Sequence, residues 1–224
     1  MAELAQNERL AAVAALGDPV RRALYELLQR SEEPLSRDQL AEAVGIPRST
    51  TSFQLGKMVD GGLLFTEFRK LGDRTGPGSG RPAKLYAAAE AELSASVPDR
   101  HYDLAARLLA GAIEKSIQDG RDVQESLADV AFEAGARLGA EAGTIASVLA
   151  AVGYQPEPDG AGGYVLANCP FHRLAKSHTV VVCGLNGALL NGALHGCGDI
   201  DHQVLPDPDG PYCCARIPRN QTVT

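Results

Sequence analysis

All five cysteines of the 224-residue chain lie in its last quarter: Cys169, Cys183, Cys197, Cys213 and Cys214. Clustered cysteines in an intracellular protein favour metal binding or redox chemistry over structural disulfides. Thiolates are soft ligands, which zinc and iron–sulfur clusters prefer. Cys169-x-x-His172 alone resembles half of a zinc site, but it has no matching pair elsewhere. The pattern therefore predicts a metal centre whose ligands come from distant segments.

Three segments carry the candidate ligands. Cys169 precedes Pro-Phe in a predicted loop, Cys183 lies in an apolar run predicted to be helical, and Cys213-Cys214 belong to a predicted last strand. His172 or a carboxylate would be a fourth ligand, and either thiol of the Cys-Cys pair could be the third. Alternatives stay open at this point, because buried cysteines are also ordinary core residues and neighbouring thiols can form a redox switch without metal.

A second chemical pattern lies in the first half of the chain, at residues 36–59. Ser36 followed by Gln39 forms a capping box that starts a short helix. Gly45 permits the left-handed turn that ends it, and a second helix follows from about Arg48. Two short helices joined by a glycine turn are the helix-turn-helix pattern of DNA-binding proteins.

The second helix of such a pair enters the major groove with its N-terminal residues at the base edges. Hydroxyl groups donate to phosphates or bases, arginine contacts guanine or phosphate, glutamine pairs with adenine, and an exposed phenylalanine contacts a thymine methyl. The candidate contacts are Arg48, Ser49, Thr50, Ser52, Phe53 and Gln54. Such residues also cap helices, so the prediction rests on the order of the surrounding elements.

A predicted β-hairpin follows this helix. Residues 63–69 and 83–88 alternate as strands do, and residues 70–82 are rich in glycine, proline and basic side chains. Strand, basic loop and strand form the wing of a winged helix, although a glycine-rich loop can also simply be flexible. The wing cations that would bind phosphates or the adjacent minor groove are Lys70, Arg74, Arg81 and Lys84.

The element pattern predicts an α+β protein with two domains. Helices are expected over residues 8–16 and 19–29, over most of 99–150, and over 177–195. We predict a winged helix-turn-helix domain at residues 1–94, a mixed α/β sensor and dimerisation domain containing the cysteines at 99–217, and a short tail at 218–224.

Charge is divided unevenly between the two halves. Residues 1–90 hold 12 basic and 12 acidic side chains, whereas the remainder accounts for the whole net charge of −7. DNA affinity depends on where cations cluster rather than on total charge. The sequence has neither a membrane-length apolar run nor a secretion signal, so we expect a cytoplasmic protein without a membrane partner. No nucleophile–base group or nucleotide-binding loop is apparent, so an enzyme is not expected.

Residues 8–90 resemble the winged helix of ArsR-type bacterial regulators. The similarity is carried by Leu-Gly-Asp-Pro-Val-Arg-Arg-Ala-Leu-Tyr at 16–25 and by Leu-Ala-Glu-Ala-Val-Gly-Ile-Pro-Arg-Ser-Thr-Thr-Ser-Phe-Gln-Leu at 40–55. The resemblance implies a homodimer that binds a palindromic operator in double-stranded DNA, usually as a repressor. These helices lack the Cys-x-Cys metal-sensing motif, so a sensor must lie downstream.

The C-terminal part is similar to SufR-type regulators, on the residues Asn168-Cys-Pro-Phe-His172, Val182-Cys183 and Tyr212-Cys-Cys-Ala-Arg-Ile. This similarity implies an iron–sulfur cluster, 4Fe-4S or 2Fe-2S, held by Cys169, Cys183 and Cys213 or Cys214. Cys197 has no counterpart in it. The sequence thus predicts a DNA-binding regulator controlled by such a cluster; the alternatives are a structural zinc with an organic effector, or a metal-free thiol sensor.

Overall fold

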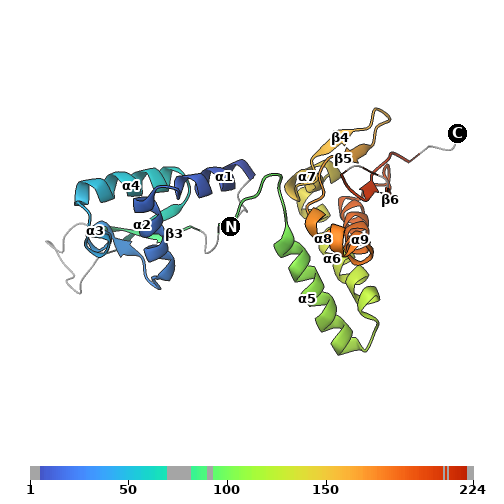
Figure 1. Ribbon diagram of the computed structural model, residues 1–224, viewed down its shortest axis with the longest axis horizontal. Helices are drawn as coiled ribbons and strands as arrows, with labels where there is room; N and C mark the ends of the chain where they lie inside the picture. Colours follow the sequence, from blue (N-terminus) through green and yellow to red (C-terminus); the bar gives the residue numbers. More distant parts are fainter. Residues whose placement is uncertain (1–5, 70–81, 90–92, 209, 211, 221–224) are drawn as a thin grey trace. The chain divides into compact units, whose positions relative to one another are not determined.

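The computed structural model describes residues 6–69, 82–89, 93–208, 210 and 212–220. The chain divides into two compact units, residues 1–95 and 96–224 (Figure 1). Each unit has its own hydrophobic core, and each is described by itself below.

Unit 1 begins with four helices: α1 (Gln6–Ala15), α2 (Pro19–Arg30), α3 (Arg37–Val44) and α4 (Arg48–Asp60). The Asp18 side chain caps α2 by accepting from two backbone N–H groups, and Pro19 occupies the first helical position. Ser36 and Gln39 form the predicted capping box of α3. Gly45 ends α3 at φ 72°, a left-handed conformation that a side chain would strain.

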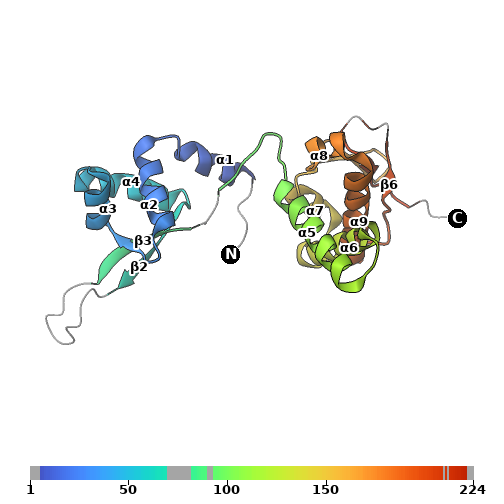
Figure 2. The same cartoon turned by 60° about the horizontal axis from the view of Figure 1, so that its bottom comes forward.

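A three-stranded antiparallel sheet completes this unit. It has the order β1-β3-β2, formed by β1 (Leu35–Ser36), β2 (Leu64–Arg69) and β3 (Ala83–Ala88). β2 and β3 are the strands of the predicted hairpin, and they lie alongside each other (Figure 2). β1 was not foreseen, since two residues are too few to show a periodic pattern. Fully buried Leu24, Leu40, Leu55 and Met58 form the centre of the core.

Unit 2 is built on helices with small strands at one end. The helices are α5 (Tyr102–Asp119), α6 (Val123–Ala142), α7 (Ile145–Ala151), α8 (His172–Ser177) and α9 (Thr179–Cys197). The strands are β4 (Pro156–Pro158) paired with β5 (Tyr164–Leu166), and β6 (Leu205–Pro206) paired with β7 (Ala215–Arg216). The helix expected at about 177–195 corresponds to α9, shifted by two residues, whereas α8, which ends before His178, was not predicted.

Helices α6 and α9 lie side by side (Figures 1 and 2), and their glycines bring the two backbones into direct contact. A Cβ atom at Gly192 or Gly196 of α9 would overlap the carbonyl oxygens of Phe132 or Ala136. Gly135 and Gly139 of α6 meet α9 in the same way. Glycines at i and i+4 on both helices therefore allow a backbone-to-backbone contact that no larger residue permits.

Among the residues described, α9 is the one helix long and apolar enough to cross a membrane, with a mean hydropathy of 1.4. The core helix of a soluble domain passes the same test. In unit 2, α9 contributes Leu185, Leu189 and Leu190 to the buried core, which gives its apolar character a structural reason.

Gly192→Ala tests the close helix contact. The added methyl group must push α6 and α9 apart, so the free energy of unfolding should fall by about 2–3 kcal/mol, as in an overpacked core. Gly187→Ala is the matched control on the same helix, because a Cβ there meets no atom within 4 Å. That control should raise stability by up to about 1 kcal/mol through helix propensity. Equal effects of the two substitutions in urea unfolding would contradict the packing argument.

Candidate DNA-binding surface and cysteine cluster

Helix α4 presents a polar, solvent-exposed face. Exposed side chains recur at i, i+3 and i+4 spacing, and they are Arg48, Ser49, Ser52, Phe53 and Lys57. Thr51 points the other way: it is fully buried, and its hydroxyl donates to the Pro47 carbonyl at 3.1 Å. Thr50 and Gln54 are half-buried at the edge of this face.

Arg48 and Phe53 are both available at the surface. Phe53 is 59% exposed, so its ring is accessible for contacts. Arg48 forms an ion pair with Asp38 at 3.3 Å, and 69% of its side chain is exposed. An exposed pair of this kind contributes little stability, so Arg48 can exchange the carboxylate for a phosphate at small cost.

Gln54 is held in place by Arg21 of α2. The Arg21 Nη1 donates to Gln54 Oε1 at 3.1 Å, and its Nε donates to the Ala15 carbonyl at 2.7 Å. Because a guanidinium has only donors, the oxygen of the amide must face Arg21. The NH2 group of Gln54 is thus the end available to donate to a base.

Lys57 was not predicted from the sequence. It lies one turn beyond Phe53, and its Nζ is 4.6 Å from the centre of the Phe53 ring, a cation–π contact. The signal was available, since Lys57 follows Phe53 by four residues and so shares its helix face. This lysine is a second cation, beside Arg48, on the exposed face of α4.

Of the four predicted wing cations, the structure describes Lys84. Lys84 lies on β3, exposed, with its Nζ 5.4 Å from the centre of the Tyr86 ring. Lys70, Arg74 and Arg81 lie outside the described residues. Arg69, at the end of β2, pairs with Glu33 at 2.7 Å and with Glu67 at 2.8 Å.

Four cysteines from three segments meet in unit 2. Side-chain interactions link Cys169 with Cys213, Cys213 with Cys214, and Cys214 with Cys183. Cys169 lies in the loop before α8, Cys183 in the second turn of α9, and Cys213-Cys214 just before β7 rather than within it. We call these four residues the cysteine cluster. Cys169 and Cys213 are buried, at 3% and 5% exposure.

Asn186 faces the cluster from the next turn of α9. Its Nδ2 donates to the Sγ atoms of Cys213 at 3.6 Å and Cys214 at 3.8 Å. Its Oδ1 accepts from the Tyr154 hydroxyl at 2.5 Å. Asn186 is 1% exposed and Tyr154 is fully buried. The two residues therefore form a fixed polar support that directs N–H groups at sulfur.

The four thiols differ in acidity. The hydrogen bond from Cys213 lowers the pKa of Cys169, and the backbone N–H of Phe171 adds to this effect. The interaction with Cys169 in turn raises the pKa of Cys213 to about 12. Burial raises the pKa of Cys183 to about 12, and the neighbouring Cys213 raises that of Cys214. Cys169 is therefore the thiol that ionises first.

His172 and Cys197 lie outside the cysteine cluster. The pKa of His172 is lowered by burial and by the cations Lys176 and Arg100. Cys197 ends α9, and its thiol contacts the Gly139 carbonyl at 3.6 Å. Within the described ranges no three His, Cys, Asp or Glu side chains converge on one point as a preformed cage for a metal ion.

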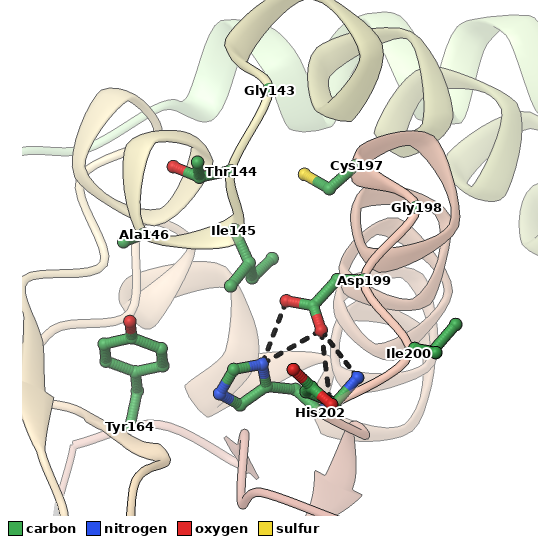
Figure 3. Close-up of a pocket in the computed structure, with 11 residues that line it drawn as sticks. Gly143, Thr144, Ile145, Ala146, Tyr164, Cys197, Gly198, Asp199, Ile200 and His202 are labelled. Atoms are coloured by element: carbon green, nitrogen blue, oxygen red, sulfur yellow. Dashed lines mark hydrogen bonds and ion pairs between the residues drawn. The ribbon is translucent and has the colours of Figure 1, made fainter.

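Cys197 instead borders a cavity of about 330 Å³ near the end of α9 (Figure 3). There the Asp199 carboxylate contacts His202 Nδ1 at 2.9 and 3.0 Å, and His202 Nε2 lies 3.0 Å from the Gly162 carbonyl. Both ring nitrogens thus face acceptors, an arrangement that the doubly protonated imidazolium satisfies. Burial opposes the charge, but the hydrogen bonds to Asp199 and Gly162 leave the pKa of His202 raised.

Comparison with known proteins identifies the class of unit 1. Residues 16–65 match the family model of a helix-turn-helix domain, a span that runs from the turn before α2 to the start of β2. The chain therefore contains a helix-turn-helix domain, which indicates DNA-binding transcription regulation. No curated protein and no solved structure matches the chain.

Lys57→Ala tests the unpredicted cation of α4. Loss of one phosphate contact should weaken binding to a labelled mixed-sequence duplex and reduce the slope of log K against log salt by about 1. Arg107→Ala, which removes an exposed cation from α5, should leave the slope unchanged. An unaltered salt slope in Lys57→Ala, measured by fluorescence anisotropy, would remove this residue from the DNA-binding surface.

His202→Gln tests the Asp199–His202 contact. Because the native pKa lies above the ordinary histidine value of 6.5, the contact contributes fully below that pH, and its contribution is lost as pH rises through the native pKa. The stability difference between wild type and His202→Gln should therefore be larger at pH 5.5 than at pH 8.5 in denaturant unfolding. The exposed His178→Gln is the control. A difference that grew with pH would refute the assignment.

Proposed function

We propose that this protein is a sequence-specific transcription regulator whose DNA binding is controlled by an iron–sulfur cluster. The cluster ligands would be Cys169, Cys183, Cys213 and Cys214. The observation that carries the proposal is that these four thiols, from three separate segments of unit 2, interact with one another in successive pairs. Helix-turn-helix regulators are typically non-enzymatic and cytoplasmic, and we propose the same here.

The DNA-binding half of the proposal rests on the exposed face of α4. Its residues Arg48, Ser49, Ser52 and Phe53 would contact DNA, with Lys57 added and with β2 and β3 as the strands of a wing. We propose that two copies act together on a palindromic operator, most simply as a repressor. A single copy offers few described cations on this face, and a dimer doubles the phosphate contacts.

The donor set fits an iron–sulfur cluster in its chemistry. Thiolates are the preferred ligands of such clusters, and N–H groups directed at sulfur tune their potential. Asn186 supplies N–H donors of this kind from a buried position braced by Tyr154. The thiols now contact one another in pairs, so metal uptake requires them to lose protons and to separate. When bound, the cluster would make the protein responsive to oxidants and to iron supply.

A metal-free thiol sensor is the second candidate, and one observation favours it. The Cys169 and Cys213 thiols interact with each other, and a peroxide could oxidise such a pair to a disulfide, releasing water. This candidate predicts that the purified protein contains neither iron nor zinc at a stoichiometric ratio to the protein.

Anaerobic reconstitution with iron and sulfide tests the proposal. The protein should become brown and contain iron and sulfide together, and its affinity for DNA upstream of its own gene should change on loading. Replacement of Cys169, Cys183, Cys213 or Cys214 by serine should each abolish or strongly reduce iron content. Cys197→Ser, outside the cluster, should load like the wild type.

Three results would each contradict the iron–sulfur proposal. A colourless protein with one equivalent of oxygen-insensitive zinc would favour a structural site and an organic effector. A protein without metal whose DNA affinity responds to peroxide would favour the thiol sensor. Equal loss of iron in Cys197→Ser and Cys183→Ser would mean that the cysteine cluster is not the site.

A further inference from the structure

The segment that leads into α5 is hydrogen-bonded, residue by residue, to the loop that carries Cys169. The Asp99 carbonyl accepts from Asn168 Nδ2 at 2.9 Å. Arg100 Nη1 donates to the Cys169 carbonyl at 2.7 Å and also to Asn168 Oδ1. The His101 backbone N–H donates to the Pro170 carbonyl at 3.2 Å. We call this set of bonds between residues 99–101 and 168–170 the linker contact.

Three of the residues in the linker contact are buried, Arg100 is half-buried, and their polar groups are hydrogen-bonded to one another. Asp99 and Asn168 are each 5% exposed, and His101 is 9% exposed. Asn168 uses its oxygen on Arg100 and its NH2 group on Asp99 and on the Gly153 carbonyl at 2.6 Å. Breaking one bond therefore leaves a buried polar group without a partner, so the two segments are expected to move together.

The linker contact joins the start of unit 2 to the loop that carries Cys169. Residues 99–101 are the part of unit 2 from which the chain runs back to unit 1, and the His101 carbonyl also accepts the first backbone bond of α5. Residues 168–170 include Cys169, whose own carbonyl is the acceptor of Arg100. One side chain thus touches both the start of the linker and the backbone of a proposed ligand.

We infer that Arg100 is a positioning residue that couples the state of Cys169 to the helix-turn-helix unit. If Cys169 held a metal, its thiol would have to give up its interaction with Cys213, and a shift of residue 169 would then be felt at the carbonyl that accepts from Arg100. Arg100 and Asn168 pass this displacement to residues 99–101 and so to the chain that leads to unit 1. The inference rests on the proposed function, and it requires two arrangements of the linker contact that metal favours differently.

Arg100→Ala in the full chain tests whether Arg100 couples metal loading to DNA affinity without affecting the loading itself. Iron and sulfide content and the visible spectrum should match the wild type, because Arg100 donates to a carbonyl and not to sulfur. The wild type should show a ratio between its loaded and metal-free DNA dissociation constants of about 5- to 150-fold, the usual range of allosteric coupling. In Arg100→Ala this ratio should fall to within about twofold of 1. Arg107→Ala, seven residues further along, should keep the wild-type ratio.

Hydrogen exchange gives a readout that does not depend on DNA. Loading the wild type with iron and sulfide should change amide exchange at residues 99–102, and Arg100→Ala should lose that change. Arg100→Gln, which keeps a polar head but cannot reach both acceptors, serves if the alanine variant fails to fold. A purely structural role would weaken both DNA-binding states equally and leave their ratio intact.

The outcomes distinguish the inference from the function on which it rests. If the wild type loads no iron, or loads it without any change in DNA affinity, the proposed function fails and the inference fails with it. If loading changes DNA affinity in wild type and Arg100→Ala alike, the proposed function stands and the inference is overturned. Unchanged exchange at residues 99–102 on loading would also overturn it.

Discussion

The close contact between α6 and α9 is the constraint on which unit 2 depends. Four glycines remove the side chains that would keep the helices apart, so the backbones themselves set the spacing. Cys183 and Asn186 belong to α9, and their distance from Cys213 and Cys214 follows from where α9 lies. Because protein interiors are close-packed, a shift of α9 by the width of a methyl group would displace every group it presents to the cysteine cluster.

Short-range chemistry made much of unit 1 predictable. Asp18-Pro19, the Ser36–Gln39 box and Gly45 each have a local meaning, and they placed the ends of α2 and α3 within a residue or two. The exposure of Phe53 followed from helical periodicity alone. The burial of Thr51 and the Arg21–Gln54 bond did not, because they depend on how α2 and α4 pack.

Unit 2 was less readable from its sequence. The preference of thiolates for soft metals predicted a shared site. The spacing of the cysteines along the chain did not predict that Cys213 and Cys214 both belong to the cysteine cluster while Cys197 does not. The support from Asn186 and Tyr154 joins residues 32 positions apart, and Arg100 contacts a carbonyl 69 positions away. Such contacts depend on tertiary folding. No local sequence pattern around Asn186 or Arg100 indicates them.

The order of segments along the chain has a consequence during translation. Residues 1–95 are synthesised before residues 96–224, and the described helices and strands of unit 1 lie within them, whereas the cysteine cluster needs Cys213 and Cys214, which follow Cys183 by 30 and 31 residues. In a nascent chain, unit 1 is therefore complete while Cys169 and Cys183 still lack Cys213 and Cys214. A ribosome that stalls between Cys183 and Cys213 would leave a chain that contains the helix-turn-helix domain but lacks two cysteines of the cluster.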